Sequence, residues 1–218
     1  MERRREVDDY PARNKKPTII DHSYRVAFYS LCIAYELDFR KRQKRMINLA
    51  GKLHDIGKIY VPDNVLLKPE GLNTNERTVV ERHALIGAEL LYDINCVYPG
   101  FSEIIESHHE NYDGTGYPHG LSKGDIPLGA RIISVTDAFD AIVSNRPYND
   151  IVSLEEALDK LIIDKGKTFD PGVVDIFVNY VLENEKEINQ IISYAQNNEA
   201  LPQKIEDRKR YLLLKKKI

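Results

Sequence analysis

The sequence predicts an all-α fold, and three observations support this prediction. Apolar residues recur at helical spacing in most segments, as Ile19, Val26 and Ile33 do near the N-terminus. Strand signals are weak, because the β-branched runs lie inside segments that already have helical periodicity. The composition, with 42% hydrophobic and 30% charged residues, is that of a globular chain able to bury a core.

Helical segments alternate with connections rich in proline and glycine. Residues of the capping-box type mark two helix starts, Asn73 with Glu76 and Ser153 with Glu156. Pro127 suits the first turn of another helix. The expected helices span residues 18–37, 40–58, 75–94, 101–110, 126–144, 153–162 and, as one or two helices, 169–198. The segments 61–73 and 111–125 are expected to be loops.

The two ends of the chain are expected to flank one domain that spans residues 18–200, as a helical bundle with further C-terminal helices. Residues 1–17 are polar and contain two prolines, which predicts a mobile arm. Residues 201–218 form a tail with seven basic and two acidic residues. This tail could touch an anionic membrane or a partner, but a frayed and solvated helix end explains its charge more simply.

Composition excludes several classes of function. The formal net charge is -3, so no strong positive field indicates DNA as the main partner. The two cysteines, Cys32 and Cys96, form no CxxC pair, which argues against a disulfide framework or a zinc finger and suits a reducing compartment. The polar N-terminus and the lack of an 18-residue apolar run give no secretory signal and no membrane span. A cytoplasmic location is therefore expected.

Histidines are the first candidates for chemistry. The six are His22, His54, His83, His108, His109 and His119. The first five lie in expected helices or at a helix end. A single histidine on an apolar helix face is usually packed in the core, so none of them alone indicates a metal site.

Three features together favour metal binding over packing. His54-Asp55 and His108-His109 are adjacent pairs, and Asp137 lies in an otherwise apolar helix, where a carboxylate needs a cation or donors. Neighbouring helix residues diverge by about 100°, so such a pair can serve one site only near a helix end or around two neighbouring ions. All the candidate ligands are nitrogen and oxygen donors, which favours Fe or Mn over a structural zinc site and leaves catalytic zinc open.

The ordered motifs resemble those of a known family. His54 and Asp55 within LHDIGK, followed by HHENYDGTGYP, resemble the HD-GYP branch of the HD phosphohydrolases. The early H-x-x-R-V pattern at His22 and the stretch that ends at His83 resemble the same family. So do RIISVTDAFDAIVSNRPYND and FDPGVVDIF. The resemblance covers residues 18–180.

The resemblance implies an all-helical enzyme, an HD-domain helical bundle with additional C-terminal helices, that hydrolyses cyclic di-GMP to pGpG and, in some members, to GMP. It implies seven metal ligands: His22, His54, Asp55, His83, His108, His109 and Asp137. Asp55 would bridge two divalent ions and so take part in catalysis. His22, His54 and Asp137 would hold one ion, and the remaining three histidines the other. A hydroxide between the ions would attack phosphorus in line with the leaving oxygen.

The resemblance also suggests residues that meet the substrate. Lys58 could polarise the phosphate or stabilise the leaving oxygen, unless it is only a surface cation at a helix end. Tyr117 offers a ring for guanine and Arg146 a planar fork for phosphate, unless both only fasten the loop. Asp140 is assigned to the substrate site or to orienting a histidine. Gly116, with Gly114, would permit the turn at the mouth of the site. His119 is expected to be a solvated loop residue.

Two departures from the family pattern refine these expectations. Thr18 stands where some relatives have a glutamate that helps hold a third metal, so two ions are expected. Asn149 stands where many relatives have a basic residue, which leaves cyclic GMP-AMP open as a substrate. The 17-residue arm is too short for a sensor domain, so a separate sensor protein or a diguanylate cyclase could be a partner.

Two other functions stay open at this point. The chain could hydrolyse another nucleotide phosphoester, or it could be a slow, metal-bearing interaction module for signalling partners. The intact GYP loop argues against the first of these, and the intact ligand set argues against the second. A homodimer is also open.

Overall fold

The structure is a computed structural model that describes residues 17–144 and 152–197. Within these ranges every regular element is helical, apart from one isolated bridge between Lys165 and Phe169. The predicted all-α fold is therefore confirmed. The expected N-terminal arm, the basic tail and the segment with Arg146 and Asn149 lie outside the described residues, except that Pro17 begins the first helix.

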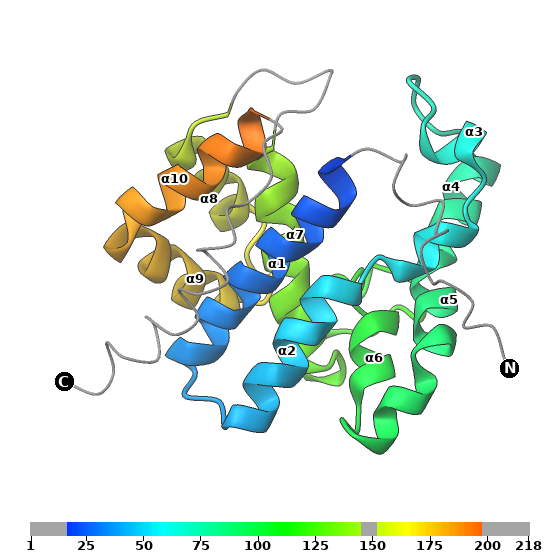
Figure 1. Ribbon diagram of the computed structural model, residues 1–218, viewed down its shortest axis with the longest axis horizontal. Helices are drawn as coiled ribbons and strands as arrows, with labels where there is room; N and C mark the ends of the chain where they lie inside the picture. Colours follow the sequence, from blue (N-terminus) through cyan, green and yellow to red (C-terminus); the bar gives the residue numbers. More distant parts are fainter. Residues whose placement is uncertain (1–16, 145–151, 198–218) are drawn as a thin grey trace, which may run out of the picture.

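The helices follow one another with short connections (Figure 1). The α-helices are α1 (Pro17–Glu36), α2 (Lys41–Leu53), α3 (Asp63–Leu66), α4 (Thr74–Glu81), α5 (His83–Leu90), α6 (Phe101–Glu106), α7 (Leu128–Val143), α8 (Leu154–Ile163), α9 (Pro171–Glu183) and α10 (Glu185–Gln196). The 3₁₀ helices are η2 (Ile56–Tyr60), η3 (Tyr92–Cys96) and η4 (Lys123–Asp125). No described helix is both long enough and apolar enough to cross a membrane.

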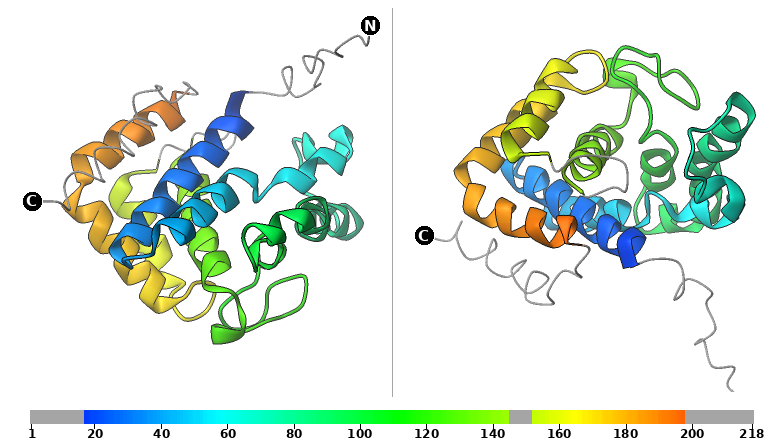
Figure 2. Two further views of the ribbon diagram at one scale, coloured as in Figure 1. Left: turned by 60° about the horizontal axis from the view of Figure 1, so that its bottom comes forward. Right: turned by 90° about the horizontal axis from the view of Figure 1, so that it is seen from above.

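Helices α1, α2 and α7 form the centre of the bundle. Helix α1 packs on α2, α7 and α9, while α7 also packs on α8 and α6. Figures 1 and 2 show α8, α9 and α10 on one side of this centre and α3 to α6 on the other. Tyr29, Phe139 and Phe177 join three helices through edge-to-face contacts, with ring centroids 5.0–5.9 Å apart.

Helix starts agree well with the sequence signals. The side chains of Asn73 and Ser153 each accept a hydrogen bond from the backbone N–H three residues later, and Glu76 and Glu156 bond back to the cap residues. Both capping boxes are thus present. The expected segment 169–198 forms two helices, and the Asp170 carboxylate caps the first of them.

Helix ends differ from the sequence prediction in three places. The single helix expected over 40–58 ends at Leu53, and the chain then turns into η2. The helix expected over 75–94 is interrupted at Arg82 and ends at Leu90, and the helix expected over 101–110 ends at Glu106. The first break follows from packing of η2 against α5, which a straight continuation of α2 would not allow. His54 directly follows the end of α2, His83 directly follows the break at Arg82, and His108 lies two residues after the end of α6.

Candidate metal centre

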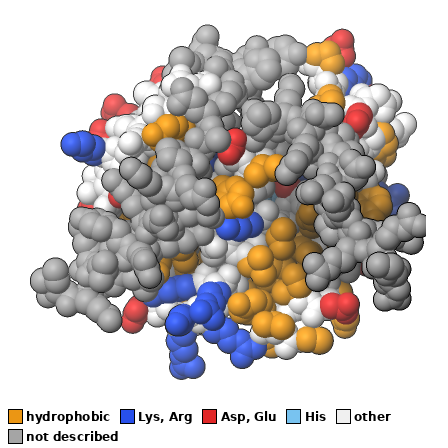
Figure 3. Space-filling model, in the orientation of Figure 1, with side chains coloured by type: hydrophobic (Ala, Val, Ile, Leu, Met, Phe, Trp, Pro, Cys, Tyr) orange, Lys and Arg blue, Asp and Glu red, His pale blue; other side chains and the backbone are white. Residues whose placement is uncertain are grey.

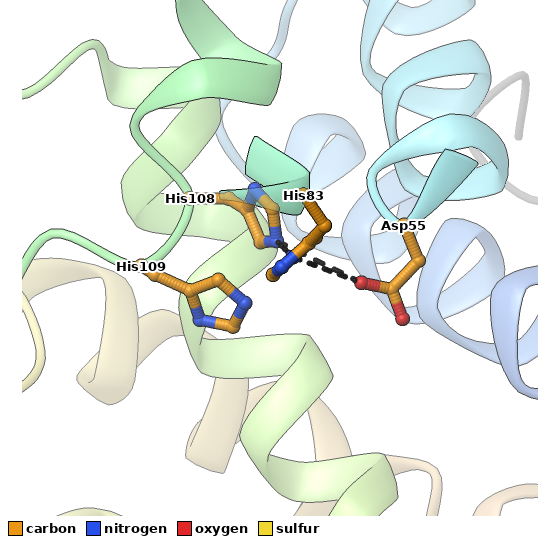
Figure 4. A group of neighbouring side chains, drawn as sticks. All are labelled: Asp55, His83, His108 and His109. Carbon is orange, nitrogen blue, oxygen red and sulfur yellow. Dashed lines mark hydrogen bonds and ion pairs between the residues drawn. The ribbon is translucent and has the colours of Figure 1, made fainter. Parts of the chain in front are cut away.

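The seven predicted metal ligands come together where α1, α2, η2, α5 and α7 meet the end of α6. They form two groups, in each of which one donor atom per residue lies within 4.8 Å of the others: Asp55, His83, His108 and His109 in one group, and His22, His54 and Asp137 in the other. Figure 4 shows the three imidazoles of the first group beside the Asp55 carboxylate. Residues more than 100 positions apart, such as His22 and Asp137, thus share one site.

The Asp55 carboxylate lies between the two groups and turns one oxygen toward each. Its Oδ2 is 3.4 Å from Nε2 of His54 and 4.0 Å from Nε2 of His22. Its Oδ1 is 3.3 Å from Nε2 of His83 and 4.0 Å from Nε2 of His108. This arrangement suits a carboxylate that contacts two cations at once.

Three of the histidines are oriented by the same kind of local hydrogen bond. Nδ1 of His54, His83 and His108 donates to the backbone carbonyl three residues earlier, over 2.9, 2.6 and 2.6 Å. Because Nδ1 is bonded to a carbonyl, Nε2 is the nitrogen that faces the centre of the site and that can bind a cation once it carries no hydrogen. Each ring stands at or just beyond a helix end, where adjacent side chains can converge.

His22 is oriented by a carboxylate in place of a carbonyl. Its Nδ1 lies 2.7 Å from Oδ2 of Asp140, and its Nε2 lies 3.1 Å from Oδ1 of Asp137. Asp140 is fully buried and also accepts from Nε and Nη2 of Arg25, over 2.6 and 2.9 Å. Because both oxygens of Asp140 face His22 and Arg25, the structure places this residue behind the site and not at its mouth.

The two carboxylates of the site, buried Asp55 and partly buried Asp137, remain ionised. Burial would raise the pKa of Asp55, but His54 and Lys58 hold it well below its usual range. Burial would likewise raise the pKa of Asp137, but His22 and His54 hold it well below. Burial would lower the pKa of His54, whereas Asp55 and Asp137 raise it to about 10. The carboxylates therefore require positive charge beside them, from these imidazoles or from bound cations.

Two histidines of the other group, His108 and His109, are neutral. Burial, together with the neighbouring imidazoles, lowers the pKa of His108 well below its usual range. Burial also lowers the pKa of His109, to about 4. A neutral imidazole is the form that binds a metal ion, so no proton has to leave these two rings.

Two buried atoms show that the residues fit a metal. Nε2 of His54 and Oδ1 of Asp55 are buried and have no hydrogen-bond partner within residues 17–144 and 152–197. Leaving such an atom without a partner costs about 1–3 kcal/mol, and a cation would satisfy both. The donors around them are imidazole nitrogens and carboxylate oxygens, which suit Fe, Mn and Zn. The residues present therefore fit a divalent ion in each group.

Lys58 stands at the rim of the centre. Its Nζ donates to Oδ2 of Asp55 over 2.6 Å, and its side chain is 27% exposed. The contact arises because Lys58 lies three residues after Asp55 on a 3₁₀ turn, in which residues i and i+3 eclipse one another. The ammonium group can thus reach both the buried carboxylate and the solvent side of the site.

The loop after His109 closes over that histidine. The Tyr117 ring stacks on the His109 ring with centroids 4.9 Å apart, and the Tyr117 N–H donates to the His109 carbonyl over 3.2 Å. A Cβ on Gly116 would lie 2.2 Å from the backbone nitrogen of Asn111. Gly116 is thus required by close backbone approach, whereas Gly114 has φ 87° and supplies the left-handed turn.

Sequence reasoning missed two buried residues that hold the site. Glu110 accepts from the backbone N–H groups of His119 and Leu121, over 2.7 and 3.1 Å, and so fastens the loop. Arg25 stands out in the sequence only as part of a motif, yet it neutralises Asp140. The His119 ring is 47% exposed, as expected for a loop residue, but its Nε2 also lies 2.9 Å from Oε1 of Glu106. No local pattern distinguishes Glu110 from a solvated acid at a helix end.

Replacing Asp140 with Asn should weaken the His22 group specifically. The variant leaves the buried Arg25 guanidinium without its counter-charge, which is expected to lower the free energy of unfolding by about 3–5 kcal/mol. It also weakens the support of His22, so affinity for one ion should fall roughly 10–100-fold. Denaturant unfolding and metal titration measure these effects. The exposed Asp159 on α8 provides the matched control, Asp159→Asn. Unchanged metal affinity in Asp140→Asn would contradict the orienting role.

Comparison with known proteins agrees with this geometry. The model of the HD domain family matches residues 11–173. The cyclic di-GMP phosphodiesterase response regulator RpfG of Xanthomonas campestris is 40% identical over 171 residues, which cover 78% of this chain and 44% of that protein. The 3'3'-cGAMP-specific phosphodiesterase 2 of Vibrio cholerae is 34% identical over 160 residues, which cover 73% of this chain and 31% of that protein.

A solved structure has the same fold. Bd1817, a HDG"Y"P protein from Bdellovibrio bacteriovorus, is 25% identical with a TM-score of 0.62, over 78% of this chain and 54% of that chain. The chain spans less than half the length of the two curated relatives above. The similarity therefore concerns one part of those longer proteins. Residues 11–173, which match the HD domain family, include all seven residues of the two groups.

Proposed function

Because the chain belongs to the HD domain family, in its HD-GYP branch, we propose that it is a metal-dependent phosphodiesterase that hydrolyses cyclic di-GMP to pGpG, GMP or both. The observation that carries this proposal is the position of Asp55, with one oxygen toward each of the two donor groups. The proposed catalytic domain spans residues 18–200. A cytoplasmic location suits the free thiols of Cys32 and Cys96.

Each group would hold one ion, and Asp55 would contact both. His22, His54 and Asp137 would hold one divalent ion, and His83, His108 and His109 the other. The nitrogen and oxygen donors favour Fe or Mn. When bound, such ions supply Lewis acidity: they neutralise charge on the phosphoryl oxygens and make an attacking water acidic enough to react near neutral pH. Two ions are expected and not three, because Thr18 offers no carboxylate.

The chain's own residues would position and stabilise the reacting phosphate. Lys58 brings a positive charge to the solvent side of Asp55, where it can stabilise charge that develops on the leaving oxygen. Tyr117, half-buried on His109, can stack on a guanine base with its other ring face. Arg146, which lies outside the described residues, is also proposed to contact the substrate. Asp140 is assigned to orienting His22 and not to the substrate.

Lys58→Met tests the role of the ammonium group. The variant keeps the side-chain stem and removes the charge, so kcat should fall by about 10²–10³-fold. The metal content should stay at two ions per chain, because Lys58 is not a proposed ligand. Steady-state kinetics and metal analysis measure the two effects. Lys186→Met, on the exposed face of α10, is the control. Turnover equal to that of the control would mean that Lys58 is only a surface cation.

A second substrate is favoured by one specific observation. A relative that is 34% identical is named a 3'3'-cGAMP-specific phosphodiesterase, and Asn149 replaces a basic residue of the family pattern. Cyclic di-GMP and cyclic GMP-AMP should therefore be offered in parallel to the Mn(II)-loaded protein, with the products separated by chromatography. Conversion of cyclic di-GMP to pGpG or GMP is the expected result. No turnover of either substrate by a protein that holds two ions would overturn the proposal.

A further inference from the structure

A dense group of cations lies at the start of α2, far from the metal centre. We call it the α2 basic cluster, and its members are Arg40, Lys41, Arg42, Lys44 and Arg45. All but Lys44 are exposed, and Lys44 extends over the ring of Tyr35 with its Nζ 4.1 Å from the ring centroid. None of the five forms an ion pair within the parts of the chain that the structure describes. Even with Glu36 and Asp38 before it, the segment 36–45 keeps a net charge of +3 in a chain whose net charge is -3.

The fold itself does not explain this cluster. A helix N-terminus carries partial positive charge, so basic residues in the first turn are unfavourable there. Helix α8 follows the usual pattern, with Glu155 and Glu156 in its first turn, whereas the first turn of α2 contains no acid. The start of α2 is instead secured by Gln43, whose Oε1 accepts from the Arg40 N–H over 2.9 Å. The cations therefore serve something other than helix stability.

The α2 basic cluster does not serve to attract substrate to the metal centre either. The centre lies beyond the C-terminal end of α2, where His54 and Asp55 follow Leu53. A helix of 13 residues is about 20 Å long. Exposed charges are screened beyond about 8 Å at physiological ionic strength. The cluster thus lies too far from the metal centre to attract substrate to it.

Apolar side chains lie directly beside the cluster. A guanidinium N–H of Arg42 donates to the carbonyl of Val97, and the Val97 side chain is 59% exposed. Figure 3 shows Lys and Arg side chains gathered at the lower edge, where α1 turns into α2, next to a hydrophobic area on the side of α6. Exposed cations with apolar neighbours are the combination that binds an anionic lipid surface, because the cations meet headgroups while apolar groups enter the interface.

We propose that the α2 basic cluster, with Val97 beside it, is a docking surface for an anionic phospholipid bilayer. It would hold the domain at a membrane surface through the start of α2. Charge complementarity between these cations and the headgroups provides the attraction. The proposal uses none of the basic residues of 201–218 and does not depend on the proposed enzymatic activity.

The test compares binding of the full chain to two kinds of vesicle. One kind is phosphatidylcholine alone, and in the other a third of the lipid is phosphatidylserine. The cluster variant carries Lys41→Glu, Arg42→Glu and Arg45→Glu. The control variant carries Lys160→Glu, Lys167→Glu and Lys186→Glu, three exposed lysines elsewhere, so both change the net charge equally. Co-sedimentation gives the partition coefficients, and thermal unfolding verifies that each variant is folded.

The expected result is selective binding to the phosphatidylserine vesicles that only the cluster variant loses, by on the order of 100-fold. A milder triple variant, Lys41→Gln, Arg42→Gln and Arg45→Gln, should lose about tenfold and guards against a folding defect. Three results would overturn the proposal. They are absence of binding by the unaltered chain, retained binding by the cluster variant, and equal loss in the cluster and control variants.

Discussion

Asp55→Asn is expected to abolish turnover of cyclic di-GMP. Asn has nearly the same size but no charge, so the two donor groups lose the carboxylate that faces both. The ions would then lack a shared ligand, and the buried Nε2 of His54 would face a neutral amide. We expect kcat/KM to fall by at least about 10³-fold, which is about 4 kcal/mol of transition-state stabilisation. Product chromatography and metal analysis of the same preparation measure both consequences.

Two controls make this result specific. Asp93→Asn changes an exposed carboxylate in η3 and should leave turnover and metal content unaltered. Thermal unfolding of metal-free Asp55→Asn verifies that the helices still form. If Asp55→Asn kept two ions per chain and more than a tenth of the turnover, Asp55 would not be the shared ligand, and the proposed arrangement of the centre would be wrong.

Gly57→Ala is expected to have a large effect through packing alone. A Cβ at this position would lie 2.0 Å from the His83 carbonyl oxygen and 2.8 Å from the backbone nitrogen of Gly87. Both atoms belong to the backbone of α5, so η2 must move away from α5. We expect the free energy of unfolding to fall by about 3 kcal/mol. The separation of Asp55 from His83, now 3.3 Å, should also increase and reduce turnover about 100-fold.

Gly71→Ala is the matched control for this change. Gly71 lies in the connection before α4, and a Cβ at this position would have no described atom within 4 Å, so its replacement should leave stability and turnover nearly unaltered. Chemical denaturation gives the free energy of unfolding of both variants, and steady-state kinetics gives their turnover. A Gly57→Ala protein as stable and as active as Gly71→Ala would show that the contact between η2 and α5 can relax, and that it does not set the distance from Asp55 to His83.

The sequence was informative about local structure and about ligand types. Helical periodicity and the capping residues at Asn73 and Ser153 predict elements that the structure contains. The pairing of His54 with Asp55 and the position of Asp137 in an apolar helix indicate residues that the structure brings together. These features are readable because each depends on neighbours within about one helical turn.

Features that depend on tertiary packing could not be predicted in this way. No glycine or proline marks the end of α2 at Leu53, because the break arises from the approach of Gly57 to α5. The sequence allows Asp140 either to contact the substrate or to orient a histidine. The choice depends on its burial against Arg25, which lies 115 residues away in the sequence. The loop anchored by Glu110 likewise depends on backbone donors that no local pattern identifies.

The most direct test of the central claim is an anomalous-diffraction experiment on crystals of the Mn(II)-loaded protein, with metal analysis of the dissolved crystals. Two ions per chain are expected. One should be bound by His22, His54 and Asp137 and the other by His83, His108 and His109, with one oxygen of Asp55 on each. One ion, three ions, or two ions that do not share Asp55 would contradict the proposed centre.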